Sequence, residues 1–255
     1  MRTSEETVSA LKQREWLLYD VIPMMLDRFL YELKHSRDLI TGQTKADSLP
    51  LTHNDTIKGF LSLHGFYINK AELSIKLPYQ EAQMKAGIVA SAPYFLEQLQ
   101  RTHNYLSLAI DQVEGFSKPS DSQVTIELLE DLYKYVGHAL HAFDYPNEAA
   151  LFPYKVCHPK FFQPPLKQDI VIEFCVQDVF IACNIYTLDY SHTKHSNKLD
   201  KNSSIVCRTY KDKQVLIVHQ IKTQTQSAIL TELKRSLKLM LELCQTHKQM
   251  LLQAK

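Results

Sequence analysis

Glycine is scarce in this chain, with only six in 255 residues. None of the six belongs to a G-x-x-x-x-G-K or G-x-G-x-x-G motif, which excludes the common loops that hold nucleotide phosphates. So few glycines also argue against an all-β fold built on many tight turns. No G-x-S-x-G or H-E-x-x-H motif is found either. The sequence indicates no catalytic, cofactor-binding or metal-ligating residue, and we expect the protein not to be an enzyme.

Long apolar runs are missing too. No stretch approaches the roughly 20 consecutive apolar residues of a membrane helix, and the N-terminal segment MRTSEETVSALKQREW is polar and charged. The five cysteines are odd in number and scattered, which argues against a disulfide framework. These absences predict a cytoplasmic protein.

Charge is unevenly distributed along the chain. The net charge is +1, but residues 1–190 carry −7 and residues 191–255 carry +8. In one interpretation, the acidic segment 121–148 flanks the basic last helix within the fold. In the other, the basic region meets an acidic partner, phosphates or an anionic membrane surface.

Two stretches place apolar residues at alternating steps of three and four, which puts them on one face of a helix and is typical of zipper-like packing. The first row is Leu96, Leu99, His103, Leu106, Ile110 and Val113. The second row is Leu230, Leu233, Leu237, Met240, Cys244, His247 and Leu251. Two such rows in distant parts of the chain predict helices that pack together and present a surface.

Further helices and loops follow from local signals. Residues 4–39 form an amphipathic pattern with Leu11 and Leu18 on the apolar face, and Pro23 predicts a kink or break near residues 20–22. A third helix is expected after a cap at Asp121 or Ser122. Composition predicts a loop at 40–54, and five prolines make 145–168 a linker or an ordered surface loop.

Strands are expected in two blocks. The first holds 57–63 and 73–77. The second holds a hairpin at 170–188 and a hairpin that joins 205–210 to 215–221. The polar, basic loop 190–204 between these hairpins has the composition of a disordered segment, and a last helix is expected at 224–253.

The order of these elements predicts an elongated α+β protein whose parts are discontinuous in sequence. Residues 1–40, 94–145 and 224–255 would form an antiparallel helical bundle with zipper-like packing. Residues 50–93 and 146–223 would form a separate antiparallel β domain, with both blocks of strands in one sheet.

Several residues invite a chemical role. His138 and His141, and likewise His192 and His195, have spacings that a metal could use, although supporting thiolates or carboxylates are lacking. Cys157 stands next to His158, but a catalytic pair is usually brought together from distant positions, so an anchor for an apolar loop is the preferred interpretation.

The two histidines in the zipper rows, His103 and His247, are interpreted as polar positions that fix helix register, with a pH sensor as the alternative.

The tract 191–213 combines basic and aromatic residues, as in proteins that track a single nucleic-acid strand. Its basic residues are Lys194, Lys198, Lys201, Arg208, Lys211 and Lys213, with Tyr190 and Tyr210 beside them.

Short strings in this chain recur in the same order in a known family. They are EWLLYD at 15–20, KGFLSLHG at 58–65 and AELSIKLP at 71–78, followed by the zipper that begins with QLQ at 98–100 and the 170–188 hairpin. Over residues 12–250 the chain resembles the Rogdi leucine-zipper family, which includes the second subunit of the fungal RAVE complex. Pro23 and the lysine-rich loop after Tyr190 depart from the family pattern.

The resemblance implies an elongated fold with a helical bundle and a β domain, and a non-catalytic scaffold or adaptor role. It also implies a RAVE-like complex that promotes assembly of the vacuolar proton-pumping ATPase at vacuolar or endosomal membranes. The implied partners are a large WD-repeat, rabconnectin-like subunit and the peripheral sector of the pump. No partner-binding residue carries over. A nucleic-acid-binding protein that uses the 191–213 tract is the alternative.

Overall fold

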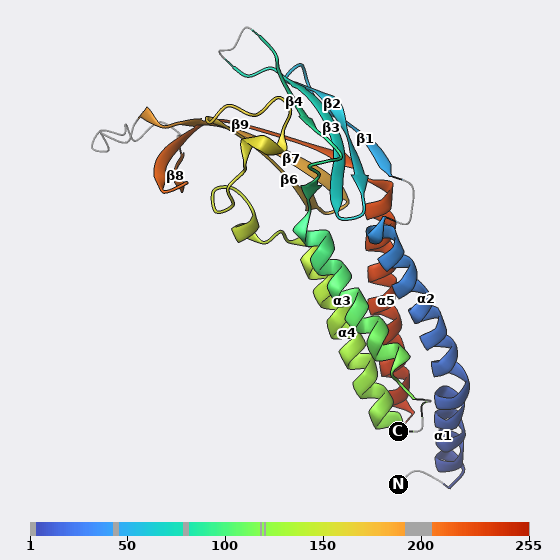
Figure 1. Cartoon of the computed structure of the whole chain (residues 1–255). Helices are drawn as coiled ribbons and strands as arrows, with labels where there is room; N and C mark the ends of the chain where they lie inside the picture. Colours follow the sequence, from blue (N-terminus) through green and yellow to red (C-terminus); the bar gives the residue numbers. More distant parts are fainter. Residues whose placement is uncertain are drawn as a thin grey trace.

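Long helices occupy one end of the molecule and two β-sheets occupy the other (Figure 1). The computed structural model describes residues 4–42, 46–78, 82–117, 119, 121–191 and 206–254. Every strand pairing in it is antiparallel. The predicted α+β class and antiparallel strands are therefore confirmed.

The chain begins with three consecutive helical segments, α1 (Ser4–Trp16), the π-helical turn η1 (Leu17–Val21) and α2 (Ile22–Thr41). Pro23 lies in the first turn of α2. The expected irregularity is present, but it is a wider π-turn and the helix continues through it. Proline lacks the N–H that an α-helix needs, and π-turns occur as single-turn irregularities within α-helices.

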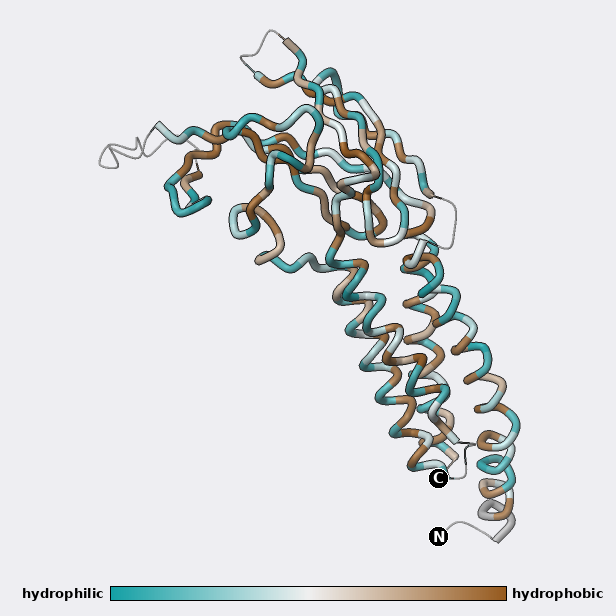
Figure 2. The backbone as a smooth tube through the Cα atoms, viewed as in Figure 1, coloured by the Kyte–Doolittle hydropathy of each residue, from teal (hydrophilic) through white to brown (hydrophobic). Residues whose placement is uncertain are grey.

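Three more long helices lie at the same end of the molecule, namely α3 (Glu97–Glu114), α4 (Ser122–Asp144) and α5 (Ala228–Gln253). Helix α2 contacts α3 and α5, and α4 contacts the same two helices. The apolar members of both predicted rows are buried, the first row in α3 and its cap residue Leu96, the second row in α5. In Figure 2 their apolar faces turn toward the neighbouring helices. As predicted, Asp121 caps α4, where its carboxylate accepts from the Gln123 N–H.

The first sheet has the order β1-β2-β3-β4, and β5 also pairs with β3. Its strands are β1 (Asp47–His53), β2 (Ile57–His64), β3 (Tyr67–Ile75), β4 (Met84–Ile88) and β5 (Tyr94–Phe95). The prediction of a loop over 40–54 was wrong for β1. In β1 the residues Leu49 and Leu51 alternate with exposed Pro50 and Thr52, a half-buried pattern that the polar flanks conceal.

The second sheet has the order β6-β7-β9-β8. Its strands are β6 (Ile170–Gln177), β7 (Phe180–Asp189), β8 (Val206–Tyr210) and β9 (Lys213–Gln226). Both predicted hairpins are confirmed, although β9 extends past 221. Helix α5 consequently starts later than expected, after the Ser227 cap. The basic loop 190–204 lies largely outside the described residues.

The expectation of one sheet was wrong. Strands β1 and β9 lie against each other, yet they are not paired in a ladder. The Thr223 hydroxyl donates to the Thr52 carbonyl at 3.0 Å. A side-chain hydrogen bond therefore joins β1 and β9, where backbone hydrogen bonds would join them if they belonged to one sheet.

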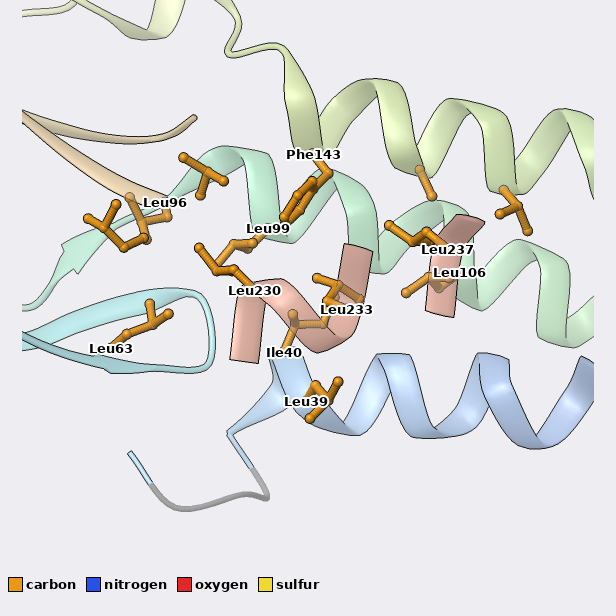
Figure 3. Close-up of a cluster of buried hydrophobic side chains, with 14 of the residues drawn as sticks. Leu39, Ile40, Leu63, Leu96, Leu99, Leu106, Phe143, Leu230, Leu233 and Leu237 are labelled. Atoms are coloured by element: carbon orange, nitrogen blue, oxygen red, sulfur yellow. The ribbon is translucent and has the colours of Figure 1, made fainter. Parts of the chain in front are cut away.

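The helices and sheets meet in a shared apolar core. Figure 3 shows Leu63 of β2 close to side chains from α3 and α5, and the largest buried cluster continues from the helices into both sheets. Buried polar contacts fix this junction. The Gln98 amide bonds to β6, and the Ser227 hydroxyl donates to the Asp47 carboxylate at 2.7 Å.

The proline-rich segment 145–168 is an ordered loop in the described structure, with short turns η2 (Glu148–Ala150) and η3 (Pro159–Phe161). Phe162 is fully buried. Gln163 exchanges two backbone hydrogen bonds with Gly87 of β4, each 2.9 Å long. The loop thus joins the two sheets.

Candidate interaction surface

The described histidine pair lies on the exposed side of α4. The His138 ring packs on Tyr105 with 5.4 Å between ring centroids, and the His141 ring packs on Tyr145 at 4.9 Å. His192 and His195 lie outside the described residues. Across the described ranges, no group of three or more His, Cys, Asp or Glu side chains is placed to hold a metal ion.

Cys157 and His158 point to different neighbours. The Cys157 thiol donates to the Ile172 carbonyl at 3.3 Å, while the exposed His158 ring lies against Phe161. Burial raises the pKa of the Cys157 thiol, which disfavours the thiolate that a nucleophile needs. This geometry suits an anchor that holds the loop on the sheet.

The zipper histidines are half-buried. The His103 ring meets the edge of the Phe66 ring, with 5.3 Å between centroids, at the junction with the first sheet. His247 Nδ1 lies 2.8 Å from the Leu243 carbonyl, one turn back in its own helix. Neither residue occupies a fully buried seam position like those of the leucines around it.

The acidic and basic segments of the chain pair inside the fold. The Lys248 ammonium of α5 lies 2.7 Å from the Glu130 carboxylate of α4. Lys234 of α5 lies 2.7 Å from Asp144 and 2.6 Å from Asp178. These pairs agree with the interpretation in which the 121–148 segment flanks the last helix.

The described part of the basic tract is a hairpin at the edge of the second sheet. Arg208, Lys211 and Lys213 are exposed there, and the Lys211 ammonium lies over the Tyr210 ring at 5.1 Å. Tyr210 itself is buried and its hydroxyl is bonded to Cys157. Tyr210 is therefore not available to stack on a base, and the other predicted lysines lie outside the described residues.

A second exposed feature, which the sequence patterns did not indicate, runs along α1, η1 and α2. We call it the α1–α2 stripe and define it as Trp16, Tyr19, Met24 and Tyr31. Their exposed fractions are 53%, 60%, 74% and 68%. Large apolar side chains are seldom grouped on a surface at this exposure unless they meet a partner.

The four stripe residues are spread over three consecutive helical segments. Trp16 ends α1, Tyr19 lies within the π-turn η1, and Met24 and Tyr31 follow in α2. Met24 and Tyr31 are seven positions apart, so this pair shares a face of α2.

Helix α1 has few contacts of its own. From position 8 to Trp16 every side chain is exposed or half-exposed. Leu11, expected on the apolar core face, is 54% exposed because α1 extends past the region where α2 packs on α3 and α5. One hydrogen bond links α1 to α4: the Arg14 Nε donates to the Ser122 hydroxyl at 2.6 Å. Helix α1 therefore offers a face that the rest of the described chain leaves uncovered.

A groove of about 450 Å³ adjoins the stripe. Its walls come from the start of α2 and from the connection after α3, and Tyr19 lines it together with Pro23 and Phe116. The stripe and the groove share Tyr19, and the groove lies toward the end of the helices far from the sheets. We call the two together the candidate interaction surface.

These features define a class of protein: an α+β chain of long packed helices and two antiparallel sheets, with an exposed apolar helix face. A family model described as Rogdi leucine zipper containing protein matches residues 13–250. The chain belongs to this Rogdi family, as the resemblance indicated. A comparison with curated protein sequences finds no match. In the described part of the chain, no helix is both long and apolar enough to span a membrane.

Proposed function

We propose that this Rogdi-family protein is a non-catalytic adaptor subunit of a RAVE-like complex that promotes assembly of the vacuolar proton-pumping ATPase. Its partners are a large WD-repeat, rabconnectin-like subunit and the peripheral sector of the pump. The protein is cytoplasmic and associates with vacuolar or endosomal membranes through these partners. Family membership over residues 13–250 supports this role.

The adaptor needs a stiff body and an open surface. In this proposal the two half-heptad rows interlock as in a zipper, and helices and strands form two units of an elongated scaffold. The buried leucines of α3 and α5 support the zipper-like packing. The position of the helices and the sheets at opposite ends of the molecule supports the two-unit scaffold.

The observation that carries the proposal is the α1–α2 stripe. Its four side chains expose on the order of 500 Å² of largely apolar surface, estimated from areas of about 150–250 Å² per large side chain. That is within the roughly 300–600 Å² of the largest patch on a monomer, which is often functional. Together with the adjoining groove, the stripe supplies much of the roughly 800 Å² that one partner buries in a standard interface.

Co-purification at physiological salt tests the proposal. The wild-type chain should recover a WD-repeat protein together with subunits of the pump. The double variant Trp16→Ala/Tyr19→Ala should lose them, since central aromatic residues each contribute about 2 kcal/mol or more to such interfaces. The matched control Tyr133→Ala removes an exposed aromatic residue from α4 and should behave as wild type.

Other outcomes would overturn parts of this proposal. Recovery of the same partners by the double variant would show that the stripe is not the docking face. Recovery of no WD-repeat protein by the wild-type chain would contradict the adaptor role. RNA that is released steeply as salt rises would instead establish the nucleic-acid alternative at 191–213.

A further inference from the structure

A small hollow lies between the proline-rich loop and the second sheet. It measures about 270 Å³ and has one acidic residue, Glu173, in its wall. Its aromatic lining consists of Tyr94, Phe95, Phe152 and Phe161. The volume is slightly below the usual range for drug-sized ligands, which is about 300–1,000 Å³, so it suits a single long side chain.

Tertiary contacts hold the loop side of this hollow in place. The Cys157 N–H donates to the Tyr210 hydroxyl at 3.0 Å. The Phe152 ring packs on the Tyr186 ring, with 4.5 Å between their centroids, and on the Tyr210 ring at 5.1 Å. The hollow is therefore formed before any ligand arrives, which lowers the entropic cost of binding.

Glu173 is 5% exposed and its carboxylate is only partly satisfied. Oε1 accepts from the Asn184 amide at 3.1 Å and from the Tyr186 hydroxyl at 3.0 Å, and Oε2 accepts from the Phe152 N–H at 2.7 Å. A carboxylate has about four acceptor positions, so one remains on Oε2. Among the ion pairs of the described residues, none includes Glu173.

The mouth of the hollow already attracts a cation. The exposed Lys155 ammonium lies over the Tyr94 ring, 5.7 Å from its centroid. Lys155 also lines the hollow. Aromatic faces attract cations, and the attraction grows when the site is desolvated. A buried carboxylate behind aromatic rings has the chemistry of a site for a positively charged side chain.

We infer that this hollow binds an arginine side chain of a partner protein, with the guanidinium stacked among the aromatic rings and donating to Glu173 Oε2. Arginine fits better than lysine because its planar, weakly hydrated group stacks on aromatic faces. Lys155 would then compete for the same place. This inference goes beyond the adaptor proposal and does not depend on the α1–α2 stripe.

An NMR titration of the full-length protein with N-acetyl-arginine N-methylamide tests this inference. The probe should shift amide signals of residues 152–161 and of Glu173. The citrulline counterpart, neutral and of the same shape, should bind at least about tenfold more weakly, because it lacks the positive charge that strengthens a hydrogen bond to the Glu173 carboxylate. Free arginine should not bind better than the capped form; tighter binding of free arginine would point to a small metabolite and overturn a protein partner.

Variants sharpen the test. Lys155→Ala should strengthen binding of capped arginine, because it removes the competing cation. Glu173→Gln should abolish the preference for arginine over citrulline. Phe161→Ala, at a 42% exposed position where folding is not at risk, should weaken binding of capped arginine several-fold. Equal binding of capped norleucine and arginine to the wild type, or weaker arginine binding by Lys155→Ala, would overturn the inference.

Discussion

The side-chain amide of Gln98 pairs with both backbone groups of Val176. Its Nε2 donates to the Val176 carbonyl at 3.0 Å, and its Oε1 accepts from the Val176 N–H at 2.8 Å. The same Nε2 donates to the Phe143 carbonyl at the end of α4. One residue in the first turn of α3 therefore completes the edge of β6 and joins the helices to the second sheet.

Replacing Gln98 with alanine should destabilise the protein by about 2–4 kcal/mol, since it leaves buried backbone groups of β6 without partners. Urea unfolding followed by circular dichroism measures the loss. Gln100→Ala is the matched control, because the Gln100 amide makes an exposed bond to Asn104 in its own helix. It should cost less than about 0.5 kcal/mol. Equal effects of the two substitutions would refute the role given to Gln98.

Alanine substitutions in the zipper helices should destabilise the protein only at the buried positions of the apolar rows. Leu99→Ala removes a fully buried side chain and should cost about 2–5 kcal/mol. Leu108→Ala, in the same helix but 47% exposed, should cost less than about 1 kcal/mol. Thermal unfolding compares the two. Similar melting temperatures for both variants would show that the row does not form the core.

Lys234 should contribute to stability in a pH-dependent way. Burial lowers the pKa of its ammonium, but the hydrogen bonds to Asp144 and Asp178 outweigh burial and raise the pKa overall. A raised pKa means that the stabilisation is complete below the unfolded value of about 10.4 and is lost as pH rises through the folded value.

The variant Lys234→Met should therefore be less stable than the wild type from pH 7 to about pH 9, and the difference should shrink above about pH 10. Lys238→Met, which alters an exposed lysine one turn further along α5, is the control. Urea unfolding over this pH range gives both differences. A Lys234→Met difference that stays constant up to pH 11 would contradict the ion-pair account.

The five cysteines are all free, and they should react with a thiol reagent at pH 8 in distinct phases. Exposed Cys207 should react fast, and Cys207→Ser should remove that phase. Burial raises the pKa of Cys175 to about 11 and of Cys244 to about 12, so both should react only on unfolding. Burst reaction of any thiol in the folded Cys207→Ser variant would indicate a more open core.

The sequence predicted the elements whose patterns were long and regular. The buried rows of α3 and α5 followed from their periodicity, and the 170–188 hairpin followed from its richness in β-branched and aromatic residues on both sides of a polar centre. Strand β1 was missed because its short LPL core lies between polar residues. The division into two sheets could not be foreseen either, since it depends on the packing of β1 against β9.

The surfaces were harder to predict than the elements. Leu11 fits the apolar face of the N-terminal helix by spacing, but more than half of its surface is exposed in the fold. The π-turn at Leu17–Val21 is an irregularity that a regular helical projection cannot represent. No sequence pattern marks Gln98 as a buried residue, because glutamine in a first helical turn usually faces water. Only the position of β6 made it a buried partner.

Hydrogen exchange on the complex recovered with the wild-type chain tests the docking account most directly. In the isolated protein, the amides of α1 should exchange rapidly, because few contacts stabilise that helix. When the WD-repeat partner binds, the amides of residues 4–31 should become strongly protected, while the exchange rates over 191–213 stay the same. Protection of 191–213 with no change over 4–31 would contradict the α1–α2 stripe as the docking face.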